Sequence, residues 1–199
     1  LALFLNRFLI PDVSFDSINY HLYLGFKGFN PLNNQFEFYP TGIHNFSPIL
    51  DMPGYLLMRV FGYRLGTIGS LIFLYLSIWI VYKIFRLYQP KFKILDHWWW
   101  GLIFVSVFLS FETFMQLATY LVDIEVLFLT LLSLYFLFKY ECSNKLINLI
   151  FSSIILSFLF LGKMTAGYIL PAYFLYLIYI LISNKKLLWK QKIFRLILS

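Results

Sequence analysis

The sequence predicts an all-α fold, a polytopic transmembrane helix bundle with a long outer first loop that contains short interfacial helices. Of the 199 residues, 61% are hydrophobic and only 13% are charged, whereas about 25% of the residues of a soluble domain are charged. So few charged side chains cannot cover the surface of a soluble globule. The apolar segments are continuous rather than alternating, which is typical of membrane helices and not of barrel strands.

The chain begins with a short apolar segment and a long polar one. Residues 1–10 are apolar and end at Pro11, but a membrane span needs about 20 residues, so this segment is interpreted as the end of transmembrane helix 1. Residues 11–63 contain Gly, Pro and Asn turn signals interleaved with aromatic residues, which favours an outer loop on the membrane interface. Two short helices are expected in this loop, at 14–24 and at 53–63, with Gly62 ending the second.

Residues 64–199 alternate long apolar segments with short polar turns. The apolar segments are expected to form transmembrane helices 2–6, at 64–85, 98–111, 126–140, 146–161 and 168–182. Residues 187–199 are expected to begin a further helix. The chain is therefore interpreted as the N-terminal portion of a longer protein.

The basic residues orient these helices. The loops at 83–97, 139–145 and 184–195 hold 11 of the 16 Lys and Arg residues, and short loops with such an excess remain in the cytoplasm. The first loop is therefore expected outside, and the net charge of +7 is interpreted as anchoring charge rather than as a nucleic-acid surface. The single cysteine, Cys142, excludes an intrachain disulfide and is expected at a cytoplasmic helix end.

The acidic residues have the opposite distribution. Seven of the 9 carboxylates fall on the outer side, although acidic residues contribute little to orientation. Topology therefore does not account for this excess of acidic residues. The excess instead indicates a functional site. The outer ends of successive helical hairpins are expected to bring polar groups to one face.

The first candidate group lies just after Pro11. Asp12 and Asp16 are four residues apart, so one helical turn would place both on the same face, and Tyr20 and His21 follow directly. A carboxylate at a membrane surface can accept a proton from a sugar hydroxyl or hold a metal. The alternative is that both are solvated acids of a loop that caps the following helix.

Two later outer turns carry the other candidates. Tyr120, Asp123 and Glu125 lie where two membrane helices meet, and ionisable groups at membrane depth are usually functional; the alternative is a solvated hairpin. Lys163 follows Gly162 in a tight turn, and an ammonium group amid acids suits a phosphate ligand. The alternative is a lysine that reaches toward lipid headgroups.

No metal or cofactor is assigned from the sequence. The histidines show none of the paired spacings of zinc sites. A divalent cation would find better oxygen ligands in Asp12, Asp16 and Asp123, and the metal requirement stays open.

The order of these motifs resembles a known superfamily. An outer Asp-Ser-x-x-Tyr-His follows helix 1, and a Tyr-Pro turn and an interfacial helix ending in Phe-Gly-Tyr follow it. A Tyr-x-x-Asp outer turn and a Gly-Lys-x-Thr outer turn come later. This order resembles the C-type (GT-C fold) glycosyltransferases, specifically bacterial relatives of protein O-mannosyltransferases and of the aminoarabinose transferase of lipid A, over their N-terminal half.

The resemblance implies a polyprenyl-phosphate-linked sugar donor, transfer on the outer face of the bacterial inner membrane, and a lipid, glycan or protein acceptor. It selects Asp16 as the base, because the family base lies in the first outer loop. Lys163 matches the lysine that contacts the lipid phosphate, and Tyr120 and Asp123 match a motif that lines the same cavity. Asp12, Tyr20 and His21 are assigned to substrate binding. Asp12 and Asp16 are spaced more widely than the acidic pair of the family.

Two further classes stay open. A transporter or flippase would need ionisable residues in the middle of helices and paired broken helices, whereas the polar groups here lie at helix ends. The other alternative is a non-catalytic membrane subunit or an inactive fragment of a transferase.

Overall fold

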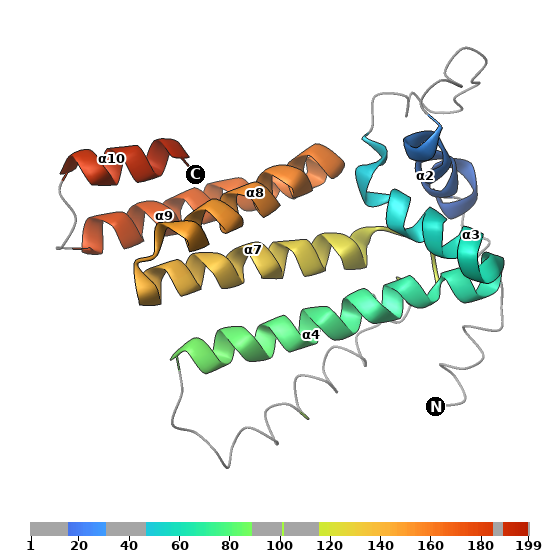
Figure 1. Ribbon diagram of the computed structural model, residues 1–199, viewed down its shortest axis with the longest axis horizontal. Helices are drawn as coiled ribbons and strands as arrows, with labels where there is room; N and C mark the ends of the chain where they lie inside the picture. The colour runs from blue at the N-terminus through green and yellow to red at the C-terminus, as the bar shows by residue number, and fades with distance from the viewer. Residues whose placement is uncertain (1–15, 31–46, 89–100, 102–115, 185–188, 199) are drawn as a thin grey trace.

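The computed structural model describes residues 16–30, 47–88, 101, 116–184 and 189–198, and this part of the chain is helical without strands. The predicted all-α class is therefore confirmed for these residues. Four long helices run alongside one another, α4 (Ile68–Tyr88), α7 (Asp123–Ser143), α8 (Leu146–Gly162) and α9 (Leu170–Ser183) (Figure 1). Two further helices, α2 (Leu22–Phe29) and α3 (Met52–Gly66), lie together at one end.

Two of the described helices have the length and composition of a membrane span. α4 and α7 each contain 21 apolar-rich residues, and at about 1.5 Å per residue such a helix matches the roughly 30 Å of a bilayer core. They cover most of the spans expected at 64–85 and 126–140. α8 and the helical stretch Gly167–Ser183 are apolar but shorter. The spans expected at 1–10 and 98–111 lie outside the described residues, apart from Gly101.

α7 and α8 form an antiparallel hairpin with a tight turn at Asn144, which has a left-handed backbone (φ 55°). Small polar side chains join them: Ser133 Oγ donates to Ser152 O at 3.0 Å, and Ser152 Oγ donates to Ser133 O at 2.8 Å. Small residues allow close approach of helices in membranes. The buried core between α7, α8 and α9 includes Leu137, Leu149, Tyr173 and Leu177.

The N-terminal helices differ from the predicted loop. A π-helical turn, η1 (Ser17–His21), continues directly into α2, so the helix expected at 14–24 reaches Phe29. The turn signals at Gly25 and Gly28 were therefore misleading, because both glycines lie inside α2. A Cβ atom on Gly25 would lie 2.4 Å from Cβ of Tyr55, so the glycine permits the close packing of α2 on α3.

The helix expected at 53–63 is present as α3 and extends beyond its predicted end. Gly62 has a non-helical backbone (φ 82°, ψ 167°), but the helix resumes and runs to Gly66. Thr67 then separates α3 from α4, where its Oγ1 donates to Arg64 O at 2.7 Å. Gly62 is therefore a break within α3 rather than its end.

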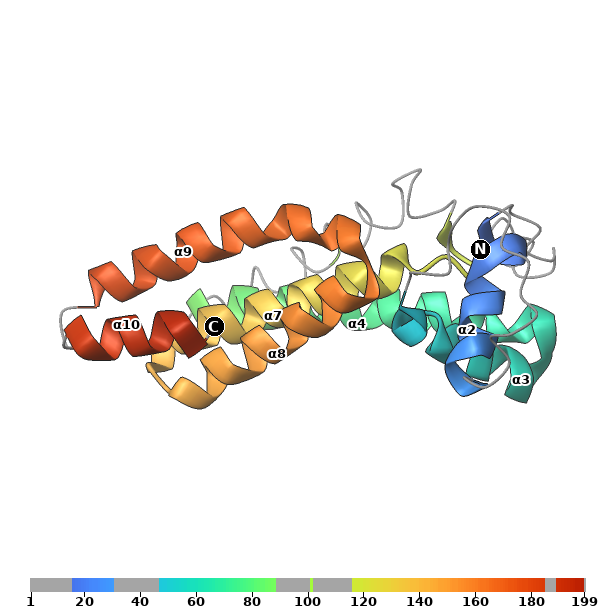
Figure 2. The ribbon, with the colours of Figure 1, turned by 90° about the horizontal axis from the view of Figure 1, so that it is seen from above.

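The opposite end of the long helices is basic. The helix expected at 187–199 is present as α10 (Trp189–Leu198), which returns alongside α8 and α9 (Figure 2). Nη1 of Arg195 donates to the Tyr140 hydroxyl at 2.7 Å and to Asn144 Oδ1 at 2.6 Å. α10 is thus bound to the turn between α7 and α8.

Candidate functional site

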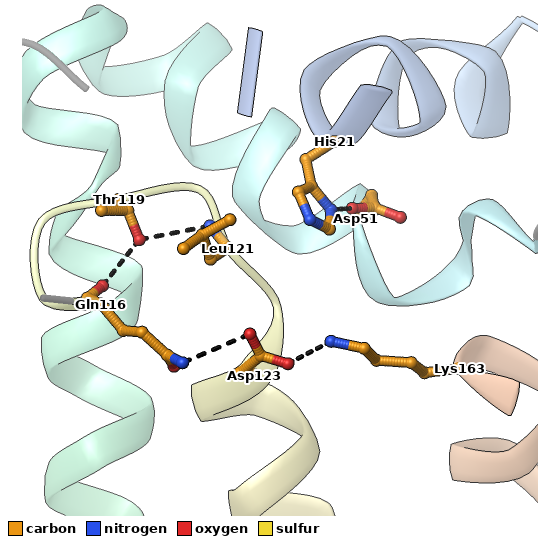
Figure 3. Close-up of polar contacts among 7 residues, drawn as sticks. All are labelled: His21, Asp51, Gln116, Thr119, Leu121, Asp123 and Lys163. Atoms are coloured by element: carbon orange, nitrogen blue, oxygen red, sulfur yellow. Dashed lines mark hydrogen bonds and ion pairs between the residues drawn. The ribbon is translucent and has the colours of Figure 1, made fainter. Parts of the chain in front are cut away.

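Two ionisable side chains meet where α2 packs against the start of α3. His21 ends η1, and Asp51 directly precedes α3; each residue is only 7% exposed. Nδ1 of His21 lies 2.5 Å from Oδ1 of Asp51 (Figure 3). Burial raises the pKa of the Asp51 carboxyl, and the neighbouring His21 and Lys163 offset part of that rise.

A second ion pair lies near the first one. Lys163 has an extended backbone between α8 and η5 (Met164–Ile169), and its Nζ contacts Oδ1 of Asp123, the first residue of α7 (Figure 3). Gln116 Nε2 donates to the other oxygen of Asp123 at 3.3 Å. The charge of Lys163 also acts on Asp51, so the two pairs form one electrostatic cluster.

The turn before α7 places Gln116 and Asp123. Thr119 Oγ1 donates to Gln116 O at 2.7 Å and accepts the amide of Leu121 at 3.3 Å. Ala118 adopts a left-handed backbone (φ 60°), and its amide donates to Ser70 Oγ of α4 at 3.0 Å. The turn is therefore attached to α4.

Asp16 and Tyr20 lie at the same end. The Tyr20 hydroxyl is hydrogen-bonded to Asp16. Burial raises the pKa of Tyr20 most, and the Asp16 carboxylate raises it further. The charges of Asp51 and Asp123 also act on Tyr20. Tyr20 is therefore protonated at neutral pH and donates its hydrogen bond to Asp16.

The structure brings five of the predicted site residues to one end of the helices: Asp16, Tyr20, His21, Asp123 and Lys163. Tyr120 lies nearby, but its hydroxyl donates to the backbone oxygen of Tyr63, and the two rings are 5.4 Å apart. Its phenol therefore connects the turn before α7 to the broken part of α3. Asp12 lies outside the described residues.

Asp51 and Gln116 of this cluster were not assigned to the site from the sequence, and Glu125, which was noted beside Asp123, was given no role. Asp51 was recognisable as an outer acid that precedes Pro53 at a helix start, which is a helix-capping position. Its pairing with His21, 30 residues earlier, could not be predicted from the spacing of the two residues. Glu125 is 8% exposed, and the charges of Asp51, Asp123 and Lys163 act on it.

The cluster combines proton acceptors with a cation. The carboxylates of Asp16, Asp51 and Asp123 are acceptors, His21 and Tyr20 are donors, and Lys163 carries the positive charge. Within the described ranges, no group of three or more His, Cys, Asp and Glu residues is arranged to hold a metal ion. The arrangement suits an anionic ligand that also presents hydroxyl groups.

Comparison of the chain with protein-family models, curated proteins and solved structures gives no match.

Proposed function

We propose that this protein is a membrane glycosyltransferase that moves a sugar from a polyprenyl-phosphate-linked donor to an acceptor on the outer face of the bacterial inner membrane. The observation that carries the proposal is the convergence of polar residues at one end of the long helices. Asp16 and His21 come from the first described helix, Asp123 from the start of α7, and Lys163 from the end of α8. Most described basic residues outside this cluster lie toward the opposite end.

Lys163 is the proposed contact for the lipid phosphate. Its side chain is 28% exposed and that of Asp123 is 42% exposed, so an incoming phosphate can reach the ammonium group. An exposed ion pair is weak, and a phosphate with more negative charge competes with the Asp123 carboxylate. Arg59 and Arg64 are exposed on α3 and supply further positive charge at this end.

Asp16 is the proposed base. Its carboxylate accepts the proton of the acceptor hydroxyl, whose oxygen then forms a bond with the anomeric carbon of the sugar. The bond between that carbon and the phosphate oxygen breaks, and the lipid phosphate leaves with the electron pair. Attack from the face opposite to the phosphate inverts the anomeric configuration. Tyr20 orients the Asp16 carboxylate through its hydrogen bond.

The surrounding helices suit the isoprenoid chain of the donor. α9 exposes Leu175, Tyr179 and Ile182 by 69%, 59% and 64%, and such apolar faces are compatible with lipid. Membrane lipids are therefore proposed as the remaining partners. A transporter is less well supported, because α4 and α7 carry ionisable residues near their ends and α8 and α9 carry none.

Transfer of a radiolabelled sugar from a polyprenyl-phosphate donor in membranes tests the proposal. Wild-type membranes are expected to label an acceptor, and D16N membranes with the same amount of inserted protein are not. Asp96→Asn is the matched control, because it changes an acid expected on the cytoplasmic side. Equal transfer by wild-type and D16N protein would refute Asp16 as the base, and absence of transfer by the wild type with every donor would refute the activity.

A further inference from the structure

Within the described part of the chain, one oxygen of a buried carboxyl group in the cluster lacks a hydrogen-bond partner. Glu125 lies in the first turn of α7, and its Oε2 atom is buried without a hydrogen bond from the described residues. Among the described residues, Thr130 Oγ1 is the other buried side-chain nitrogen or oxygen atom without a hydrogen-bond partner. Buried polar groups are normally hydrogen-bonded, so an unsatisfied one calls for an explanation.

The side-chain donors of the cluster contact carboxylates other than Glu125. His21 is bonded to Asp51, and Lys163 and Gln116 both contact Asp123. Tyr20 is bonded to Asp16. Asp16, Asp51 and Asp123 therefore each have a side-chain donor from another residue. The Glu125 carboxyl has only a backbone hydrogen bond, and its Oε2 atom has no donor among the described residues.

We propose that Glu125 accepts a hydrogen bond from a hydroxyl group of the donor sugar and so distinguishes the sugar-linked lipid from the bare lipid phosphate. This inference rests on the proposed function. A sugar joined to a phosphate at Lys163 lies within a few ångströms of it, and the charge of Lys163 acts on Glu125. A sugar hydroxyl is a neutral group that can donate a hydrogen bond to a carboxyl oxygen.

Glu125 then contributes to specificity rather than to bond breaking. A site built to hydrogen-bond a substrate hydroxyl discriminates strongly against ligands without it, because the buried acceptor is then left unpaired. The bare lipid phosphate presents no such hydroxyl. Its binding is expected to depend on Lys163 and not on Glu125.

Binding of two lipids to the purified full chain in nanodiscs tests this inference. The probes are undecaprenyl phosphate and undecaprenyl-phosphate-linked hexose. Glu125→Met keeps a similar volume without the acceptor and also removes the unpaired oxygen, so it is expected to fold. We expect E125M to bind the hexose-linked lipid about tenfold more weakly, the effect of one lost hydrogen bond to a buried acceptor, with unchanged binding of undecaprenyl phosphate.

Two further variants make the result specific. Glu125→Gln keeps the shape and one acceptor oxygen and replaces the other oxygen with an amide group, so an intermediate loss of affinity for the hexose-linked lipid is expected. Thr130→Val removes the other unpaired atom on the same helix and is expected to change neither affinity. If E125M and E125Q bind both lipids as the wild type does, or lose both equally, Glu125 does not recognise the sugar. A wild-type protein that binds neither lipid overturns the proposed function and this inference with it.

Discussion

Nδ1 of His21 lies 2.5 Å from Oδ1 of Asp51, and both side chains are buried although 30 residues separate them in the sequence. The pair joins the end of η1 to the start of α3. Because Asp16 and Tyr20 lie on the same turn of chain as His21, this contact also sets their position relative to Lys163 and Asp123.

Removing one partner of the pair is expected to destabilise the protein strongly. His21→Leu and Asp51→Leu each leave a buried polar group unpaired, which costs about 3–5 kcal/mol of the free energy of unfolding. The double variant removes both groups and is expected to cost less than the sum of the single variants. Chemical unfolding in detergent measures the free energies of unfolding for this double-mutant cycle. If the double variant lost as much stability as the two single variants together, the two side chains would not interact.

Stability is expected to depend on pH through Asp51. Its pKa is raised above the ordinary value of 3.8 by burial, so the folded state holds the proton at pH values where the unfolded state has lost it. The contribution of Asp51 to stability is therefore present below pH 3.8 and is lost as the pH rises through the folded-state pKa. Between about pH 4 and 8, the free energy of unfolding of Asp51→Asn is expected to decrease less than that of the wild type. An unchanged pH profile would exclude Asp51 as the source of the pH dependence.

Lys163 is expected to matter for ligand binding far more than for folding. Its pair with Asp123 is partly exposed, so K163M should change the free energy of unfolding by about 1 kcal/mol or less. Binding of undecaprenyl phosphate should weaken by roughly 10-fold to 100-fold, because a charged hydrogen bond is lost. Asp123→Asn breaks the same ion pair but keeps the cation, so it serves as the control, and equal losses in both variants would argue against a phosphate contact by Lys163.

The contact between α2 and α3 is expected to tolerate no side chain at Gly25. A Cβ atom there would lie 2.4 Å from Tyr55 Cβ and 2.7 Å from Asp51 O, so Gly25→Ala should lower stability by about 1–3 kcal/mol through overpacking. Gly54→Ala is the matched control, since its Cβ would meet its nearest neighbour at an ordinary 3.6 Å. Alanine is the better helix former, and thermal unfolding should show the two substitutions acting in opposite directions.

Cys142 provides a test of the proposed orientation. It is the single cysteine of the chain, it is exposed, and it lies at the basic end. A membrane-impermeant maleimide is expected to label it in inside-out vesicles and not in intact cells. Tyr168→Cys in a Cys142→Ser background is expected to show the reverse, because Tyr168 is 88% exposed just beyond Lys163. Labelling of both sites from the same side would contradict the orientation.

Local features of the fold were predictable from the sequence. The positions of α4, α7, α8 and α9 followed from continuous apolar segments with polar turns between them, since a helix of this kind depends on its own residues. The glycines of α2 were interpreted wrongly, because a glycine that ends a helix and one that permits close packing have the same sequence signal. Only the partner helix distinguishes them.

The candidate site was likewise predictable only in part from the sequence. The sequence predicted that Asp16, His21, Asp123 and Lys163 share one side of the helices, because the distribution of Lys and Arg between loops indicates sidedness. It could not pair them: His21 with Asp51, and Lys163 with Asp123 across 40 residues, meet through the packing of α2 on α3 and of α7 beside α8.

By itself, the sequence determined the helical class, the apolar segments and the separation of acidic from basic ends. These depend on the composition of each segment and on the free energy of transferring it from water into an apolar phase. Among the described residues, the tertiary structure alone decided which carboxylate oxygens have a donor and which, like Oε2 of Glu125, have none. Hydrogen bonds act over about 3 Å, and distances of that size between remote residues are set only when the helices pack.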